Sequence, residues 1–304
     1  MKLFFLLTLV ASASAFVVPQ NNAVQKTNLA ATSSDMEEES NSVSRRDMLF
    51  TGLATSLLFV PTTASAEDAS AIKNVFVSGA TGQTGSRCFN KLLADKSVSV
   101  VGGVRNVAKA SKSLGANVSL KHLDVVEDSV DALASTLEGV DGLIIASGFN
   151  PGKNLLRMAA AAHEVDNVGT CKLIDAAKKA GVKKVVLVSS ILTNGRAWGQ
   201  EESPGFKITN AFGNSLDEKL ESELYLRKSG LDYTIVRPGG LQAKAPVGEL
   251  LISGEDTLNS GEISRDLVAD VCIASLTDPK ATKKVLEIIE DEGKPPKVFN
   301  GLVM

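Results

Sequence analysis

The sequence predicts a single doubly wound α/β domain, in which helices cover both faces of a parallel β-sheet. Short runs rich in β-branched residues alternate with helical patterns along the chain, which is typical of parallel strands connected by helices. The composition, with 44% hydrophobic and 22% charged residues, suits a folded globular chain and excludes a disordered or fibrous one.

The predicted strands alternate with three well-marked helices. The helix expected at residues 165–180 has a clear carboxyl end, because Lys178 and Lys179 oppose its dipole and Gly181 can adopt the left-handed cap conformation. The other helices are expected at residues 85–94 and 215–228. The strands are expected at residues 74–78, 98–102, 118–123, 142–146, 185–189, 233–236 and 285–289.

The residues before the domain are expected to be a targeting leader. Residues 1–15 place a basic residue before a short apolar run and small residues, which is the pattern of a secretory signal peptide. Residues 16–44 show no helical or strand periodicity and are interpreted as a transit segment or linker. Residues 45–66 place paired arginines before a second apolar run and an Ala-Ser-Ala site, which resembles a twin-arginine signal. The domain is therefore expected to cover residues 67–304.

The order of these segments predicts a location. It resembles the layered targeting of algae with secondary plastids, and residues 12–16 fit the Ala-Ser-Ala-Phe junction that ends the first signal there. The expected location is the plastid, in the thylakoid lumen, with the plastid stroma and secretion as alternatives. The apolar run at residues 48–60 is shorter than the about 20 residues that span a membrane, so no permanent membrane anchor is expected.

Charge and residue usage argue against two classes of function. With 32 Lys and Arg against 35 Asp and Glu, the chain has no excess of positive charge that would hold nucleic acid. Two histidines and three widely spaced cysteines form no zinc-binding pattern, so no metal site is expected. Cys88, Cys171 and Cys272 are expected to be core residues.

A glycine-rich turn after the first predicted strand is the strongest chemical signal. In its GxxGxxG pattern, Gly79 permits a tight turn, Gly82 lets the backbone approach a pyrophosphate, and Gly85 lets the helix pack close to the sheet. The amides at the start of the helix can then bind the phosphates of a dinucleotide. The alternative is a turn used only for packing. The expected cofactor contacts are Gly79, Thr81, Gly82, Gln83, Thr84 and Gly85.

The end of the second strand distinguishes the two common dinucleotides. An NAD site places an acidic residue about 20 residues after the glycines, where it binds the ribose diol. Here the strand is followed by Arg105, which can bind a 2'-phosphate through charge-assisted hydrogen bonds, and Lys109 comes shortly after it. NADP is therefore the expected cofactor, and NAD is less favoured.

Two further strand ends are expected to contact the cofactor. After the third strand, Asp124 can accept a hydrogen bond from the adenine amino group, and Val125 can form an apolar wall beside it. The alternative is that Asp124 caps the next helix. After the fourth strand, Ala146 and Ser147 are small enough for the ribose to pass.

Four motifs together resemble one known family. They lie at residues 79–85, 165–182, 186–190 and 229–240. With them, the chain resembles the atypical NAD(P)-binding branch of the short-chain dehydrogenase/reductase superfamily. This branch includes the NmrA-like proteins and the dinucleotide-binding domain of a plastid inner-envelope translocon component. The resemblance covers residues 73–290 and implies a Rossmann-type fold, an NAD(P) cofactor and oxidoreductase chemistry.

The sequence departs from the catalytic pair that this resemblance implies. Members that reduce carbonyls use a tyrosine four residues before a lysine. The lysine binds the ribose of the cofactor, and the phenol of the tyrosine exchanges a proton with the substrate. This chain has two tyrosines, and the residues four positions after them are Ser229 and Arg237. The usual pair is therefore absent.

Two residues remain as catalytic candidates. The resemblance places Ser190 at the end of the fifth strand, where it could donate a hydrogen bond to a substrate oxygen that gains negative charge. It places Lys219 on the next helix, where the ammonium could bind the nicotinamide ribose. The structural alternatives are that Ser190 is only a serine in the turn after the strand and that Lys219 is one of several charges on a solvent-exposed helix face. Pro238 and Gly239, after the sixth strand, are expected to line the nicotinamide pocket.

Two functions of different class remain. The first is an NADP-dependent oxidoreductase acting on a small organic substrate, with a proton that comes from water or from the substrate. The second is a non-catalytic, NADP-dependent redox sensor or assembly factor that binds a plastid protein. The long segment at residues 191–215 is expected to shape a substrate pocket or a partner surface, with Trp198 as a pocket wall or a packing anchor. Superfamily frequency favours the enzyme.

Overall fold

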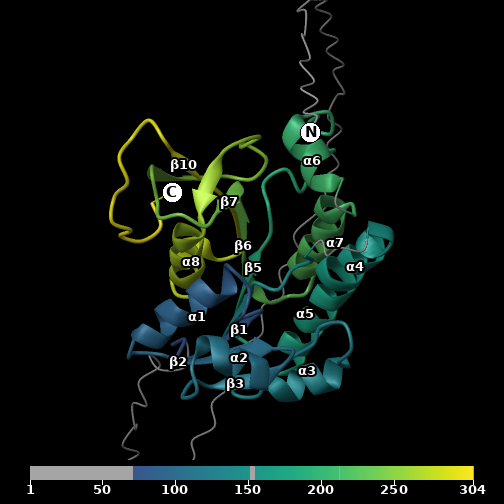
Figure 1. Cartoon of the computed structure of the whole chain (residues 1–304), viewed down its shortest axis with the longest axis vertical. Helices are drawn as coiled ribbons and strands as arrows, with labels where there is room; N and C mark the ends of the chain where they lie inside the picture. Colours follow the sequence, from purple (N-terminus) through teal and green to yellow (C-terminus); the bar gives the residue numbers. More distant parts are fainter. Residues whose placement is uncertain (1–70, 151–154, 212, 304) are drawn as a thin grey trace, which may run out of the picture. The chain divides into compact units, whose positions relative to one another are not determined.

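The computed structural model describes residues 71–150, 155–211 and 213–303, and its main elements are labelled in Figure 1. The expected signal peptide at residues 1–15, the transit segment at residues 16–44 and the twin-arginine-like signal at residues 45–66 lie outside the described residues. The start of the expected domain, at residues 67–70, lies outside them as well.

The main sheet of the described residues has eight strands. They are β1 (Asn74–Ser78), β2 (Ser99–Val104), β3 (Leu120–His122), β4 (Gly142–Ile145), β5 (Lys184–Val188), β6 (Asp232–Pro238), β8 (Glu249–Ser253) and β10 (Lys284–Asp291). Their order is β3-β2-β1-β4-β5-β6-β10-β8, and every neighbouring pair is parallel except β10 and β8. The strand order reverses between β1 and β4, which is the doubly wound topology that binds ligands at the carboxyl ends of its strands. The predicted fold class is confirmed.

Helices cover both faces of this sheet (Figure 1). One face carries α1 (Gly85–Ala94), α2 (Val107–Leu114) and α8 (Arg265–Ala274), and the other carries α3 (Val130–Thr136), α5 (Thr170–Lys179) and α7 (Ser215–Lys228). Strand β1 serves both cores, because Val75 and Val77 pack on the first face and Phe76 on the second. The other helical segments are η1 (Leu155–Arg157), α4 (Met158–Ala162), η2 (His163–Gly169), α6 (Pro204–Asn210) and η3 (Pro279–Ala281).

A second, two-stranded sheet of β7 (Gly240–Gln242) and β9 (Glu262–Ser264) follows β6. The sequence predicts neither this sheet nor the antiparallel edge strand β8. Strands β7 and β8 have no buried residue and β9 has only two, so all three lack the long buried runs that mark the central strands. Their pairing depends on partners distant in the sequence.

The helix predicted at residues 165–180 is less regular than expected. Its first part belongs to the π-helical turn η2, and only α5 is α-helical. The predicted carboxyl end is confirmed, because Lys178 and Lys179 occupy the last turn of α5 and Gly181 has a φ of +74°.

Two carboxylates of β10 hold the segments that follow β6. Glu287 accepts hydrogen bonds of 2.7 to 3.0 Å from the backbone amides of residues 256–258. Glu290 accepts bonds of 2.5 to 2.8 Å from the amides of residues 247–248 and of Ser264. Charge-assisted hydrogen bonds of this kind are stronger than neutral ones, so β10 fixes the connections around β8 and β9.

The three cysteines do not share one environment. Cys88 and Cys272 are fully buried, as predicted, but Cys171 is partly exposed on α5, so its assignment to the core is wrong. Burial still raises the pKa of the Cys171 thiol to about 11, and the negative charges of Asp175 and Glu221 add to the shift. The thiol is therefore protonated, and a poor nucleophile, at neutral pH.

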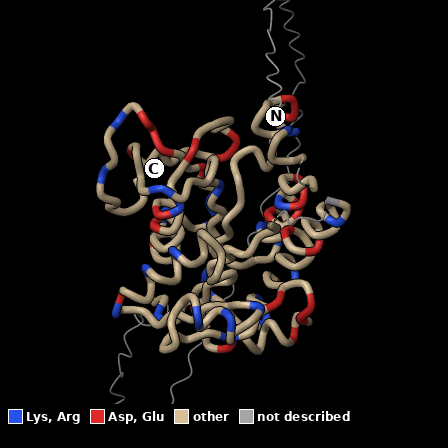
Figure 2. The backbone as a smooth tube through the Cα atoms, viewed as in Figure 1, with Lys and Arg blue, Asp and Glu red and all other residues tan. Residues whose placement is uncertain are grey.

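Basic and acidic residues are interspersed along the described part of the chain rather than separated into oppositely charged halves (Figure 2). No helix among the described residues is long and apolar enough to cross a membrane. In the same residues, no three His, Cys, Asp or Glu side chains are grouped so that they could hold a metal ion.

Candidate functional site

The predicted glycine turn connects β1 to α1 and is fixed by backbone hydrogen bonds. The amides of Gly79 and Ala80 donate to the carbonyl of Gly103 on β2, at 3.1 and 3.2 Å. The amide of Gly82 donates to the carbonyl of Gly79 at 2.8 Å. Gly79 has a φ of +74°, which confirms that a glycine is needed for this tight turn.

Two glycines of the motif are required by packing inside the protein. A β-carbon at Gly79 would lie 2.8 Å from the backbone of Ser147. A β-carbon at Gly85 would lie 2.2 Å from the carbonyl oxygen of Gly79, a contact that no side chain tolerates. Gly85 therefore lets α1 start directly against the turn, as predicted.

The middle of the turn faces solvent. Residues 81–83 are exposed, and a β-carbon at Gly82 would have one close neighbour among the described residues, the Gly79 carbonyl oxygen at 3.1 Å. Thr84 is buried at the amino end of α1. A helix end presents backbone amides and the positive end of the helix dipole, so this exposed turn has the chemistry of a phosphate site.

The segment after β4 lies against the glycine turn. The buried Ser78 hydroxyl, at the end of β1, donates to the Ser147 hydroxyl at 2.9 Å, and the Ala146 amide donates to the Ser78 carbonyl at 3.2 Å. Ala146 and Ser147 are both partly exposed. The structure thus brings these two predicted cofactor contacts next to the turn.

Arg105 follows β2 directly, and its side chain is exposed. Its carbonyl oxygen lies 3.1 Å from Nδ1 of His122, at the end of β3. The next residue, Asn106, caps α2 by accepting a hydrogen bond from the Lys109 amide at 2.8 Å. The backbone on both sides of Arg105 is therefore held while the guanidinium is free to reach a ligand at the edge of the sheet.

Asp124 caps a turn rather than a helix. Its Oδ1 accepts hydrogen bonds from the amides of Val126, at 3.0 Å, and Glu127, at 3.4 Å. Helix α3 is capped instead by Ser129, so the alternative that Asp124 caps the next helix is wrong, because this turn intervenes. Val125 is 7% exposed and packs in the core under α3 and α5, which leaves little of its surface for an adenine ring.

Strand β5 ends in a sharp turn at Ser190. The hydroxyl of Thr193 lies 3.2 Å from the buried hydroxyl of Ser189 and donates to the Ser190 carbonyl. Leu192 has a φ of +66°, which is uncommon for a residue other than glycine. Ser190 is partly exposed, and its hydroxyl has no hydrogen-bonding partner among the described residues. This hydroxyl is available to a ligand.

Lys219, on α7, forms an ion pair that the sequence does not predict. Its Nζ lies 3.2 Å from Oδ1 of Asp166, whose side chain is 2% exposed. The Phe149 amide donates to the same oxygen at 2.8 Å. The alternative of a solvated surface charge is therefore wrong for Lys219, because its side chain is only 22% exposed and has a buried partner. Asp166 lies within the motif at residues 165–182, but the pattern of that motif does not identify Lys219 as its partner.

Ser215 stands four residues before Lys219, at the position of the tyrosine in the catalytic pair described above. It is 8% exposed, and its hydroxyl donates to the Thr209 carbonyl at 3.2 Å. The position before Lys219 where the usual pair has a tyrosine thus has a serine, and the hydroxyl of this serine is hydrogen-bonded to the backbone.

Pro238 and Gly239 are buried at the end of β6. The Pro238 carbonyl accepts a hydrogen bond from the Ile191 amide at 3.0 Å, and the Gly239 amide donates to the Ile288 carbonyl at 2.9 Å. A β-carbon at Gly239 would lie 2.5 Å from the carbonyl oxygen of Gly261. Gly239 therefore packs against the segment just before β9, and the place of both residues in a nicotinamide pocket stays a prediction.

The segment at residues 191–214 is held against its neighbours. Arg196 makes two hydrogen bonds of 2.9 Å to Asp217 on α7. Trp198 is partly buried against a small apolar cluster, which supports its alternative as a packing anchor. The buried residues of this cluster are Ile191, Leu192, Phe206 and Leu216.

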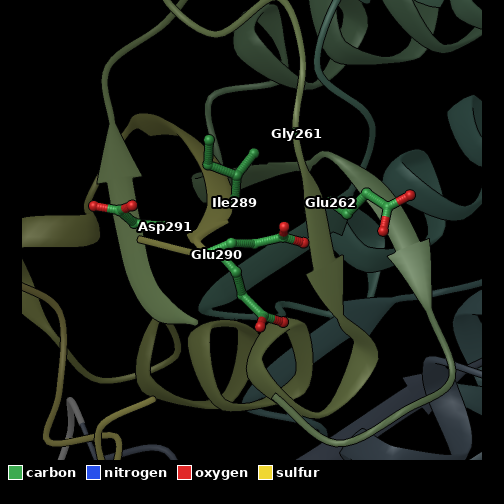
Figure 3. A pocket seen from close by; sticks show the side chains of 6 residues that line it. Gly261, Glu262, Ile289, Glu290 and Asp291 are labelled. Carbon is green, nitrogen blue, oxygen red and sulfur yellow. The ribbon is translucent and has the colours of Figure 1, made fainter. Parts of the chain in front are cut away.

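A pocket of about 560 Å³ lies at the start of β9 and the end of β10, and Figure 3 shows Glu262 and Asp291 on either side of Ile289. Its acidic walls would repel phosphate groups, so it does not suit a dinucleotide. None of the predicted cofactor contacts lines it. The lining residues are Gly261, Glu262, Ile289, Glu290, Asp291 and Glu292.

Three curated proteins are similar to this chain. An uncharacterized chloroplastic protein of Arabidopsis thaliana is 44% identical over 78% of this chain and 84% of its own length. Sanguinarine reductase of Eschscholzia californica is 30% identical over 77% of this chain and 96% of its own length. Protein TIC 62 of Pisum sativum, a chloroplastic protein, is 32% identical over 73% of this chain and 43% of its own length.

A solved structure and a family match agree with these relatives. The crystal structure of the oxidoreductase ylbE from Lactococcus lactis is 28% identical, covers 73% of this chain and 92% of its own, and superposes with a TM-score of 0.60. The resemblance inferred from the four motifs is confirmed by these matches. Residues 79–279, which begin at the first glycine of the turn and include strands β2 to β6, match the family described as NAD(P)H-binding. This chain therefore belongs to the NAD(P)H-binding family.

Proposed function

We propose that this protein is an NADP-dependent oxidoreductase acting on a small organic substrate. The observation that carries the cofactor choice is the exposed Arg105 at the end of β2, where an NAD site has an acidic residue. A guanidinium can bind a 2'-phosphate with two charge-assisted hydrogen bonds. Lys109, exposed on α2, adds a second positive charge nearby.

The remaining contacts follow from the positions described above. The pyrophosphate binds along the glycine turn, the adenine near the end of β3, the ribose after β4, and the nicotinamide near the end of β6. The proposed cofactor contacts are Gly79, Thr81, Gly82, Gln83, Thr84, Gly85, Arg105, Asp124, Ala146, Ser147, Lys219, Pro238 and Gly239.

Ser190 is the proposed catalytic residue. When bound, NADPH supplies the hydride. The free hydroxyl of Ser190 donates a hydrogen bond to the substrate oxygen that gains negative charge, and Lys219 binds the nicotinamide ribose. Because Ser215 replaces the tyrosine, the proton comes from water or from the substrate. Two relatives are named as a reductase and an oxidoreductase, which supports this class of reaction.

Ser215 also favours a second candidate function, an NADP-dependent redox sensor or assembly factor that binds a plastid protein. A protein of this kind binds the cofactor without consuming it, so it needs no phenol beside Lys219. A panel of carbonyl and aromatic substrates distinguishes the two functions. Loss of NADPH absorbance with any of them supports the enzyme, and binding without turnover across the panel supports the sensor.

We also propose a plastid location, in the thylakoid lumen. The Arabidopsis and Pisum relatives are chloroplastic by name, and the leader carries three successive targeting patterns. Removal of residues 1–66 would leave a domain that begins at Glu67. Amino-terminal sequencing of the protein from isolated thylakoids tests this, and a start at Phe16 would contradict the lumen route.

Arg105→Glu, in the full chain, is expected to abolish the preference for NADPH. The unmodified protein should bind NADPH at least about tenfold more tightly than NADH, a gap of about 1.4 kcal/mol, because only NADPH carries the 2'-phosphate. Calorimetric titration with both cofactors measures this gap. The variant should bind the two equally or prefer NADH, since a carboxylate repels the phosphate.

Lys96→Glu is the matched control for that experiment. It makes the same change of charge at an exposed residue just before the amino end of β2, at the opposite edge of the sheet from Arg105. It should leave both affinities unchanged. If Arg105→Glu retains the preference for NADPH, Arg105 does not bind the 2'-phosphate.

A further inference from the structure

Asp166 is a buried carboxylate that has no role in the chemistry described so far. Its side chain is 2% exposed, and it lies on η2, the π-helical turn between α4 and α5. Burying an ionised carboxylate is strongly unfavourable unless partners compensate for the lost water. The partners of Asp166 therefore indicate what it does.

The backbone around Asp166 is locally distorted. Among the residues that the structure describes, the π-helical form is confined to η2, and the helices before and after it are regular. Gly169, at its end, lies so close to its surroundings that a β-carbon would stand 2.8 Å from the Glu164 carbonyl oxygen and from the Val125 side chain. Single π-helical turns within helices occur frequently at functional sites.

This turn makes two separate contacts with α7. Glu218 accepts a hydrogen bond from the Asn167 side chain at 2.8 Å and lies 2.9 Å from Nδ1 of His163. The next residue of α7, Lys219, pairs with Asp166 at 3.2 Å. The contact between the two helices is thus secured by Glu218, and the Asp166 pair is an additional feature that fixes one lysine.

The other contact of Asp166 lies on the cofactor side. Its Oδ1 accepts a hydrogen bond from the Phe149 amide at 2.8 Å, in the segment that follows β4. A β-carbon at the exposed Gly148 would lie 3.5 Å from this Oδ1 and 3.6 Å from Nζ of Lys219. Ser147, one residue earlier, lies against the glycine turn. One carboxylate oxygen therefore holds the lysine beside the segment that borders the proposed ribose site.

We propose that Asp166 is a positioning residue that holds the Lys219 ammonium where it binds the nicotinamide ribose of NADPH. The inference rests on the proposed function and extends it to a residue that acts through Lys219. Since Lys219 serves the nicotinamide half of the cofactor, loss of Asp166 should affect that half and spare the adenine half.

The test uses the full chain and two ligands. NADPH carries both halves of the cofactor, whereas adenosine 2',5'-bisphosphate carries the adenine half and lacks the nicotinamide ribose. Asp166→Asn and Lys219→Met should each weaken NADPH binding by about tenfold, the size of one hydrogen bond to a charged group. Neither should change the affinity for adenosine 2',5'-bisphosphate. The double variant should bind NADPH no more weakly than Lys219→Met alone, because both changes remove one interaction.

Glu218→Gln is the matched control, because it alters a neighbouring carboxylate of the same helix contact and should leave both affinities unchanged. Unaltered NADPH binding in Asp166→Asn overturns the inference, and so does an equal loss for both ligands, which indicates a general structural role. If Asp166→Asn does not fold, the result for Lys219→Met tests the inference. Unaltered NADPH binding in Lys219→Met would mean that Lys219 does not bind the cofactor, which overturns the proposed role of Asp166. Failure of the unmodified chain to bind either ligand overturns the proposed function itself.

Discussion

Replacing Arg237 with methionine is expected to lower the free energy of unfolding by about 3–5 kcal/mol, because it leaves buried carboxylates without their cation. Arg237 is fully buried near the end of β6. Its guanidinium donates to Glu223 at 2.6 Å, to Asp256 at 2.8 Å and to Glu287 at 3.3 Å. Glu223 and Glu287 are also fully buried. Burial alone would lower the pKa of Arg237, but the hydrogen bond and charge of Glu223, with those of its other partners, raise that pKa.

Urea denaturation followed by circular dichroism measures this loss. Arg157→Met is the control, because Arg157 pairs with Glu164 at a side-chain exposure of 66% and should contribute less than about 1 kcal/mol. Adding Glu223→Gln to Arg237→Met should recover part of the stability, since one uncompensated charge is removed. If Arg237→Met costs no more than the control, the buried carboxylates do not depend on this cation.

Gly85→Ala is expected to destabilise the domain by about 1–3 kcal/mol, the usual cost of overpacking, and to weaken NADPH binding by at least tenfold. The added β-carbon would stand 2.2 Å from the Gly79 carbonyl oxygen and 2.8 Å from its carbonyl carbon. Because both are backbone atoms, α1 must move away from the turn. That movement displaces the amides proposed to bind the pyrophosphate. Thermal unfolding and NADPH titration measure the two effects.

Gly82→Ala is the informative partner of that variant. Its β-carbon would meet the Gly79 carbonyl oxygen at 3.1 Å and otherwise faces solvent, so stability should change by less than about 1 kcal/mol. NADPH binding should still weaken, because the β-carbon stands where the pyrophosphate is proposed to approach. Equal NADPH affinity in Gly82→Ala and the unmodified chain would place the pyrophosphate elsewhere.

Local signals in the sequence were sufficient for β1, α1 and the turn between them, whereas α2 and α3 were not among the predicted helices. The predicted bounds of β1 and α1 agree with the structure, because a buried β-branched run, a glycine turn and an amphipathic helix each occupy consecutive residues. Strand β8 was missed because its pairing with β10 joins segments far apart in the chain, and neither of its faces is fully buried. The π-helical turn was missed because residues 163–169 carry an ordinary helical pattern.

Some residues of the candidate site could also be predicted from local sequence, whereas others could be identified only in the folded chain. The tight turn at Gly79 and the close approach of Gly85 involve backbone of the same turn, so the spacing of the glycines predicted them, whereas the contact of Gly79 with Ser147 requires the folded chain. Lys219 was identified through its family resemblance, but its partner Asp166 lies on another helix and only the folded chain brings the two together. For Asp124 the sequence left a cofactor contact and a helix cap open, and the structure removes the second because Ser129 caps α3.

The place of β10 in the sheet has a consequence for synthesis on the ribosome. It lies between β6 and β8, although it is the last strand in the described chain. A nascent chain that has not yet reached Lys284 therefore exposes the edge of β6, whose unpaired amides and carbonyls are open to pairing with other chains. The glycine turn and its strands emerge much earlier. We therefore expect the incomplete chain to be prone to aggregation until its last strand closes that edge.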